Sequence, residues 1–424
     1  MASPFPLLPL FLAVLLGVAL ATARGRVPPF LPLFSGALLL GVAAGMDIST
    51  AVSAATAGIG RVFSVLAVVV FSGSVIAKTL GAQGLIDRMV AGLSARVPDP
   101  RSLSAVSGFL LALPATCCIT AFVVLSPAVR ALGGDGTERA RLLSLCAAGS
   151  VLSYVLVFPT PVTVPLLSGP AQGLSPLLYD LVAVPLGLAL LGGLIATSRR
   201  HRGGSGEGAL PAPPGWDSAG VSSLWSWAPF AAIFAALPVT LVPLALPPAQ
   251  AVTLSMLAGL AAALLPAPPA ARREGLLAGT RHAGVIMFDI CGAGALGAVA
   301  AAAGVPGEIV PLAGAVLPAA LVPFAVAAVL QAALGSRVSA AVAASGILAG
   351  SAAAGALSPL PLALSVAAGL LLVSWVTDPL FWLLHRETGA TVGEISRAYT
   401  LPLALCGAAV LAAALAIHAA GIPP

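Results

Sequence analysis

Residues 331–345 read QAALGSRVSAAVAAS, and they place an arginine in the middle of an apolar run long enough to cross a bilayer. About 28 uncharged residues precede Arg337, back to Ile309, and about 40 follow it before the next charge. A charge at bilayer depth costs roughly 2.5 to 3.5 kcal/mol on insertion scales, so such side chains usually face a cavity or a partner. Gly335 and Ser336 predict a helix break followed by an N-cap. The stretch therefore predicts an anion site at a helix N-terminus inside a membrane.

The composition sets the class of protein. Hydrophobic residues fill 59% of the 424 positions and charged residues only 8%, which excludes a water-soluble globule and predicts an all-α polytopic membrane protein. The net charge of +5 reflects Lys and Arg gathered on one membrane face, so no nucleic-acid partner is expected. The five cysteines have no metal or disulfide spacing, and the adjacent Cys117 and Cys118 are interpreted as small packing residues. Neither a cofactor nor a metal is expected.

The first half of the chain divides into apolar runs of unequal length: residues 5–21, 28–44, 62–80, 103–113, 119–132, 142–167 and 177–197. The leader before the first run carries no positive charge, which argues against a cleaved signal peptide. Residues 47–61 are expected to form a polar link, and Ser72-Gly73-Ser74 interrupts the third run, where small residues allow either close helix approach or local unwinding. The fourth and fifth runs are too short to cross a bilayer, and with Thr116 at their junction they predict a re-entrant hairpin.

The sixth run is broken by residues 158–161, FPTP. Proline removes backbone donors, so a discontinuous helix is expected here, with Thr160 as an N-cap and Pro161 as the first helical residue. Residues 203–220 are rich in glycine, proline and serine, which predicts a flexible linker. We therefore divide the chain into a first repeat, 1–202, a cytoplasmic linker, 203–223, and a second repeat, 224–424.

The two halves match at one offset. Four features recur about 220 residues apart: Ser72-Gly73-Ser74 with Gly292-Ala293-Gly294, Pro114 with Gly335, Pro161 with Pro379, and the runs 177–197 and 400–418. Each half then has about five crossings plus one hairpin, which makes the two repeats inverted. With both termini outside, all but Arg61 and Arg337 of the 19 Lys and Arg residues fall inside, in agreement with the positive-inside rule.

The second half also carries charge within the membrane. Asp289 lies eight residues past Arg281, or roughly 12 Å into the bilayer at about 1.5 Å per helical residue. Asp378 lies at the break of another discontinuous span, residues 373–384. Inverted repeats, interrupted helices and charges near the midplane are what secondary transporters use to bind substrate between two gates. No nucleophile and base pair is evident, so an enzyme is not expected.

Three stretches carry a resemblance to a known family: GAGALGAVAAAAG (292–304), QAALGSRVSAAVAASGIL (331–348) and VSWVTDPLFWLLHRETGATVGEISRAYTL (373–401). They resemble the gluconate permease (gluconate:proton symporter) family, which has G-A-G-G-A-F, R-x-A-x-G-S-x-T-V-A and N-D-x-x-F-W in the same order, and residues 29–48 extend the likeness toward the start. Gln331 stands at the family's arginine, Thr377 at its asparagine, and Arg337 at a usually small position.

The resemblance implies the fold of the broader ion-transporter superfamily, with a scaffold, a mobile transport unit that holds two hairpins, and homodimers in a bacterial-type inner membrane. It implies a proton symporter of a small organic anion, such as a sugar acid, that works by alternating access, with elevator motion as one form. A sodium-coupled carboxylate transporter and an uncoupled channel or exporter remain alternatives.

The expected site gathers the helix breaks and hairpin tips. Arg337 would bind the anionic group by two parallel hydrogen bonds, and Asp378 or Asp289 would carry the coupling proton, or sodium would take that role. The substrate-binding set is Ser336, Arg337, Gly335, Thr116, Thr160, Thr377 and Gln331. Structural alternatives are that Asp378 only caps a helix, that Arg337 pairs with Asp289, and that Asp289 satisfies a backbone break near Gly292.

Overall fold

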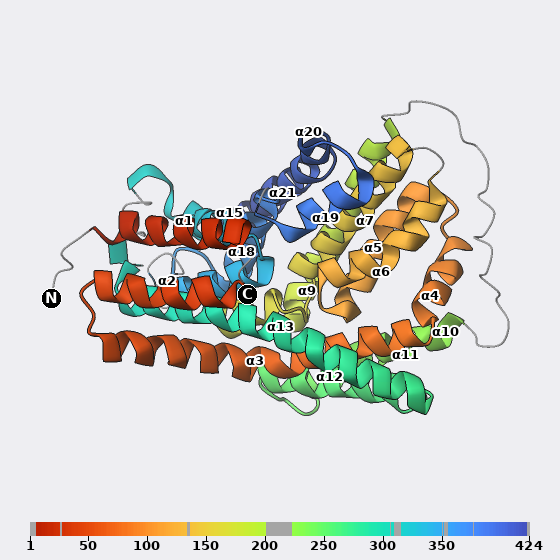
Figure 1. Ribbon diagram of the computed structural model, residues 1–424, viewed down its shortest axis with the longest axis horizontal. Coiled ribbons are helices and arrows are strands. Elements are labelled where there is room, and N and C mark those ends of the chain that lie inside the picture. Colours follow the sequence, from red (N-terminus) through yellow and green to blue (C-terminus); the bar gives the residue numbers. More distant parts are fainter. Residues whose placement is uncertain are drawn as a thin grey trace.

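The computed structural model describes residues 6–25, 28–133, 136–200, 223–305, 307–308, 315–349, 351, 355–375 and 377–421. Every regular element in these ranges is a helix (Figure 1). Five helices are long and apolar enough to cross a membrane: Ile48–Ala82, Gly136–Leu156, Pro176–Arg199, Pro269–Ala302 and Val392–Ala419. Shorter apolar helices of 10–17 residues accompany them. This architecture agrees with the expected polytopic membrane protein. The linker predicted at residues 203–220 lies outside the described residues.

The helices form two groups that contact each other. The first, here called the long-helix layer, contains α1 (Leu7–Gly25), α2 (Phe30–Ala43), α3 (Ile48–Ala82), α11 (Ala228–Leu241), α12 (Pro248–Leu264) and α13 (Pro269–Ala302). The second, here called the short-helix bundle, contains α5 (Pro100–Ala115), α6 (Cys118–Leu132), α7 (Gly136–Leu156), α8 (Thr163–Ser168), α9 (Pro176–Arg200), α15 (Val322–Leu334), α16 (Arg337–Leu348), α18 (Pro359–Leu372), α19 (Pro379–Thr388), α20 (Val392–Ile395) and α21 (Leu401–Ala419). Four shorter elements lie between these helices in the chain: α4 (Leu85–Ser94), α10 (Ser223–Ser226), η1 (Ala319–Leu321) and the π-helix η2 (Ser396–Thr400).

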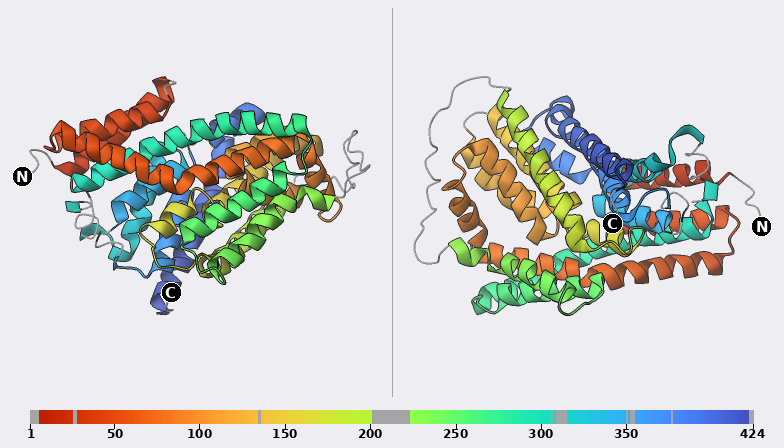
Figure 2. Two further views of the ribbon diagram at one scale, coloured as in Figure 1. Left: turned by 90° about the horizontal axis from the view of Figure 1, so that it is seen from below. Right: turned by 180° about the vertical axis from the view of Figure 1, so that it is seen from behind.

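The long helices α3 and α13 lie side by side and antiparallel in all three views (Figures 1 and 2). Glycine lets their backbones approach closely. A Cβ atom added at Gly58 would lie 2.4 Å from the Gly294 carbonyl oxygen, and one added at Gly279 would lie 2.6 Å from Val75 Cα. A larger side chain at either glycine would push the helices apart, so these small residues set the spacing of the layer.

Two sequence expectations for these helices are wrong. Residues 47–61 were expected to form a polar link, but α3 begins at Ile48 because the Asp47 carboxylate caps it, with hydrogen bonds from the amides of Ser49 and Thr50. The helix also continues through Ser72-Gly73-Ser74. Likewise α13 continues through residues 292–294, so Asp289 lies beside no backbone break. Small residues serve close packing here and do not unwind the helix.

Two pairs of short helices meet at tight turns. Thr116 joins α5 to α6 in the left-handed conformation, with a φ of 46°. Gly335 joins α15 to α16 with a φ of 67°, and the Ser336 hydroxyl accepts a hydrogen bond from the Ser339 amide, as an N-cap does. The sequence therefore predicted both turns and the Ser336 cap.

The break between α7 and α8 is longer than expected. Thr160 is not an N-cap followed by a helical Pro161, because α8 begins only at Thr163. The Thr160 hydroxyl instead donates to the Tyr154 carbonyl oxygen at 2.8 Å, and the Thr160 amide donates to the Thr163 hydroxyl at 3.0 Å. These bonds satisfy backbone groups that the missing helical turn leaves unpaired.

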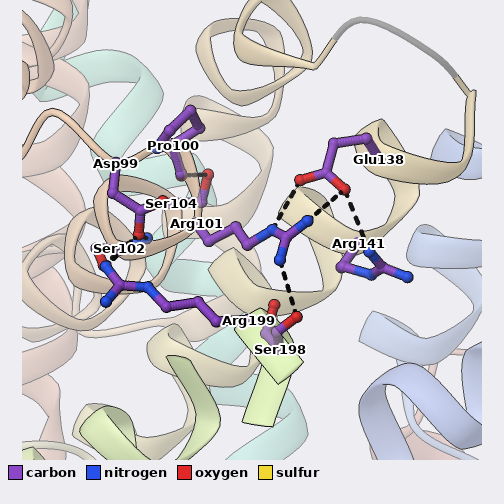
Figure 3. A network of polar contacts seen from close by, with 9 residues as sticks. All are labelled: Asp99, Pro100, Arg101, Ser102, Ser104, Glu138, Arg141, Ser198 and Arg199. Carbon is purple, nitrogen blue, oxygen red and sulfur yellow. Dashed lines mark hydrogen bonds and ion pairs between the residues drawn. The ribbon is translucent and has the colours of Figure 1, made fainter. Parts of the chain in front are cut away.

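A polar network joins three helices at one end of the short-helix bundle (Figure 3). Asp99 caps α5 through the Ser102 amide and also pairs with Arg199 of α9 at 2.7 Å. Burial would raise the pKa of Asp99, but hydrogen bonds from Ser102 and Arg199 hold it below its usual value. Arg101 donates to Glu138 of α7 and to the Ser198 carbonyl oxygen. The base of the α5–α6 pair is thereby fixed to α7 and α9.

Candidate functional site

Arg337, the first residue of α16, lies at the centre of a buried polar cluster. One guanidinium nitrogen, Nη2, donates to the Ser374 hydroxyl at 2.6 Å, to Asp378 Oδ2 at 2.9 Å and to the Tyr399 hydroxyl at 3.1 Å. Tyr399 in turn donates to Asp378 Oδ2 at 2.9 Å. The side chains of Arg337 and Asp378 are only 3% and 1% exposed. The arginine therefore joins α16, the α18–α19 break and the π-helix η2 through one buried ion pair.

Asp378 has two structural roles at once. Its Oδ2 takes part in the ion pair, while Oδ1 accepts the Leu380 amide at 2.9 Å and so caps α19. The expected cap is thus present. The alternative pairing of Arg337 with Asp289 is wrong, because Asp289 lies half-buried on α13 and accepts a hydrogen bond from the Phe30 backbone instead.

Two buried polar atoms at this cluster lack hydrogen-bond partners among the described residues. The Nε of Arg337 and the Oε1 of Gln331 are buried and make no hydrogen bond to any described residue. The amide of Gln331 is held by its other atom, Nε2, which donates to the Gly335 carbonyl oxygen at 3.2 Å. A buried polar atom that is left without a partner costs about 1–3 kcal/mol of folding stability. Such atoms therefore mark places where a ligand or water completes the hydrogen bonding.

The N-terminus of α6 lies near the same cluster. Its N-cap, Cys117, makes no side-chain cap hydrogen bond, so the first backbone amides of α6 are free of the usual capping acceptor. The charges of Arg337 and Asp378 both act on the buried Cys118 thiol, and the charge of Arg337 acts on the Tyr154 hydroxyl as well. The start of α6 thus lies within electrostatic range of the ion pair.

The two tight turns are seated differently. At Gly335 an added Cβ would lie 1.9 Å from the Thr377 carbonyl oxygen, and the Thr377 hydroxyl donates to the Ala332 carbonyl oxygen at 2.9 Å. The α15–α16 turn therefore rests directly on the α18–α19 break. At the other turn, the Thr116 side chain rests against Gly73 of α3, where an added Cβ would lie 2.2 Å from the Thr116 hydroxyl oxygen.

The family model described as GntP family permease matches residues 5–196 and 271–420. The chain belongs to the GntP permease family. It is also similar to an uncharacterized permease of Haemophilus influenzae, with 26% identity over 161 residues, which are 37% of this chain and 33% of that protein. The chain thus matches about a third of that relative's length. Membership confirms the resemblance, and together with the long apolar helices it makes this GntP family permease an integral membrane protein.

The structure groups the predicted site residues unevenly. Gly335, Ser336, Arg337, Thr377 and Asp378 lie together, with Gln331 bonded to the same turn. The remaining three contact other parts of the permease: Thr116 contacts Gly73, Thr160 lies within the α7–α8 break, and Asp289 lies beside Phe30.

Sequence reasoning missed Ser374 and Tyr399 of this GntP family permease. Tyr399 is one of only three tyrosines in the chain, a rarity that could have drawn attention to it. It reaches the cluster from η2, and π-helical turns occur often at functional sites. A π-helical turn has no sequence signature, so the contact between Tyr399 and Asp378 could not be predicted from the sequence.

Proposed function

We propose that this GntP family permease is a secondary active transporter that carries a small organic anion, such as a sugar acid or a hydroxy acid, together with a proton. The observation that supports this most is the buried Arg337–Asp378 pair, whose arginine keeps an unpartnered Nε for a further acceptor. A carboxylate matches the planar donor edge of a guanidinium. The unpartnered Oε1 of Gln331 suits a hydroxyl donor on the same substrate.

The ion pair offers a physical reason for coupling. Arg337 and Asp378 together are neutral, so an added carboxylate would leave one net negative charge in a buried place. At a distance of 4 Å and an effective dielectric constant of 20, two unit charges interact by about 4 kcal/mol. A substrate anion that takes Arg337 from Asp378 therefore favours binding of a proton to Asp378. One anion would then enter with one proton, because only the neutral combination avoids the cost of buried charge.

Helix ends add to the attraction for an anion. The N-termini of α6, α16 and α19 begin at Cys118, Arg337 and Pro379, and each N-terminus carries a partial positive charge. Ser336 and Asp378 already cap α16 and α19, while α6 has no side-chain cap. We assign the start of α6, with Thr116, to the substrate, and place Thr160 and Thr377 at the two breaks that border it.

The proposed mechanism is alternating access between two inverted repeats. Support comes from the order of the helices: α13 begins 221 residues after α3, α15 begins 222 after α5, and α16 begins 219 after α6. In an elevator form the long-helix layer is the fixed scaffold and the short-helix bundle moves, with the α5–α6 and α15–α16 pairs as re-entrant hairpins. We place both termini outside a bacterial inner membrane, residues 203–220 in the cytoplasm, and the lipid-embedded protein in a homodimer.

Flux in proteoliposomes tests the function. The purified protein is reconstituted, and uptake of gluconate and of a panel of hydroxy acids is measured with an inward pH gradient, a sodium gradient or neither. We expect accumulation with the pH gradient alone. Accumulation that needs sodium would favour the sodium-coupled alternative, and flux that never exceeds equilibrium would favour a channel or exporter. In the Asp378→Asn variant, accumulation should fail while Asp289→Asn retains it; the reverse result would move the proton to Asp289.

A further inference from the structure

Asp180, near the start of α9, contacts the helix break of the first half. Its Oδ1 accepts the backbone amide of Phe158 at 2.9 Å, between the end of α7 and the start of α8. The neighbouring Tyr179 is fully buried, and its hydroxyl has no hydrogen-bond partner among the described residues. The charge of Asp180 acts on that hydroxyl. A partly exposed carboxyl group thus lies at the α7–α8 break.

At the positions of the second half that correspond to Asp180, the chain has neutral hydroxyl groups. Tyr399 and Thr400 follow Asp180 by 219 and 220 residues, and their hydroxyls donate to Asp378 and to the Ser374 carbonyl oxygen at the α18–α19 break. The cation differs as well. Arg337 begins α16, whereas Cys118 begins the matching helix α6. The first break therefore has a carboxyl where the second has hydroxyls, and a thiol where the second has an arginine.

Arg101, Arg141 and Arg199 belong to the polar network at the Ser198 end of α9. The helices that pack most closely on α9 are α5, α7 and α21. Arg101 of α5 and Glu138 of α7 pair with each other, and Arg101 binds α9 at Ser198, 18 residues from Asp180 or about 27 Å along a helix. The other titratable or charged groups of these helices are Arg139, Arg141, Cys146 and Tyr154 on α7, Cys406 and the exposed His418 on α21, and Arg199 and Arg200 on α9. Among the described residues Asp180 belongs to none of the ion pairs.

We propose that Asp180 is a second proton-binding site of the permease, distinct from Asp378. Asp180 lies on a helix that is long and apolar enough to cross a membrane, where an ionised carboxylate without a cation is costly and the neutral acid is not. The proton adds to one carboxylate oxygen and no other bond changes. An ionised acceptor makes a hydrogen bond roughly twice as strong as a neutral one, so the proton weakens the hold of Asp180 on the Phe158 amide. Loading thereby loosens α9 from the α7–α8 break that holds Thr160. This role in coupling rests on the proposed symport, whereas the proton binding itself does not.

Infrared spectroscopy of the purified full-length protein tests the proton directly. Spectra are recorded across a pH series with aspartate carboxyl groups labelled with carbon-13. We expect a protonated-carboxyl band that persists near neutral pH, shifts with the label, and disappears in Asp180→Asn but remains in Asp378→Asn. The asparagine side chain keeps an acceptor for Phe158, so the fold should survive. In Asp180→Glu the band should persist but no longer shift with the aspartate label. A band that Asp180→Asn leaves unchanged would overturn the proposal.

Transport separates this inference from the proposed function. In proteoliposomes loaded with a pH-sensitive dye, the number of protons taken up per gluconate should be lower for Asp180→Asn than for the unaltered protein. An equal ratio would limit Asp180 to proton binding without a role in coupling. If the unaltered protein moves no gluconate under a pH gradient, the proposed function fails for that substrate, while the infrared band still decides whether Asp180 binds a proton.

Discussion

At the scale of single residues, the buried ion pair governs both stability and the proposed binding chemistry. Arg337 reaches Asp378 at 2.9 Å with both side chains nearly unexposed. Removing one partner of a buried pair costs about 3–5 kcal/mol, because the other charge is left uncompensated. The same pair replaced as a unit by neutral groups is often tolerated. The two residues should therefore behave as a unit when they are changed.

We predict that Arg337→Met and Asp378→Asn each lower the thermal unfolding midpoint in detergent, and that the double variant recovers most of the loss. Asn still caps α19, and the interaction energy between the changes should be about 1–3 kcal/mol. Uptake should be lost in Arg337→Met and in the double variant, since neither can bind the anion. Additive losses in stability would show that the two charges do not interact in the folded protein.

The tyrosines provide a matched comparison of buried hydroxyls. Tyr399 donates to Asp378 and accepts from Arg337, whereas the Tyr179 hydroxyl has no partner among the described residues. A hydrogen bond to a charged group contributes about 1.5–3 kcal/mol. We predict that Tyr399→Phe lowers the unfolding midpoint and weakens uptake, while Tyr179→Phe leaves the unfolding midpoint unchanged or raises it. Equal midpoints for the two variants would contradict this assignment.

At the scale of elements, the α15–α16 turn depends on one glycine. Gly335 has a φ of 67° and lies so close to the α18–α19 break that a Cβ would reach 1.9 Å from the Thr377 carbonyl oxygen. Gly389 has the same φ of 67° with nothing within 4 Å of an added Cβ. The two glycines thus share one backbone conformation and differ only in their surroundings.

We predict that Gly389→Ala costs about 1–2 kcal/mol, the price of left-handed backbone, and keeps uptake. Gly335→Ala should cost more, because the turn must also move off the α18–α19 break, and it should abolish uptake. Thermal unfolding and flux measured side by side test both. If Gly335→Ala transports as well as Gly389→Ala, the seating of the turn on Thr377 has no part in the site.

At the scale of the whole molecule, α3 of the long-helix layer contacts the α5–α6 turn of the short-helix bundle. A Cβ atom added at Gly73 would lie 2.2 Å from the Thr116 hydroxyl oxygen, whereas one added at Gly60 on the same helix would have no atom within 4 Å. We predict that Gly60→Ala stabilises the protein by about 0.5–1 kcal/mol, since alanine suits a helix interior better than glycine. Gly73→Ala should destabilise it and slow uptake by displacing the α5–α6 turn. Unfolding midpoints that rise in both variants would place the turn away from α3.

The sequence by itself determined the class, the short helices and several caps. The apolar composition predicted helices, because in lipid a helix forms all of its backbone hydrogen bonds internally. Gly335, Ser336 and Asp378 predicted a turn and two helix caps, because these preferences depend only on local sequence. It misjudged the start of α3, and it left open whether the small residues within the long helices unwind them or let two helices touch. Only packing decides between those outcomes.

Only the tertiary structure decided the partners of the buried charges. Arg337 could have met either Asp289 or Asp378, which lie 48 residues before it and 41 after it in the chain. The choice of Asp378, and the arrival of Ser374 and Tyr399 beside it, follows from how α16, the α18–α19 break and η2 pack together. A hydrogen bond needs its donor and acceptor atoms to lie about 3 Å apart. A sequence fixes which groups a chain can offer, but spatial contact between distant segments fixes which of them meet.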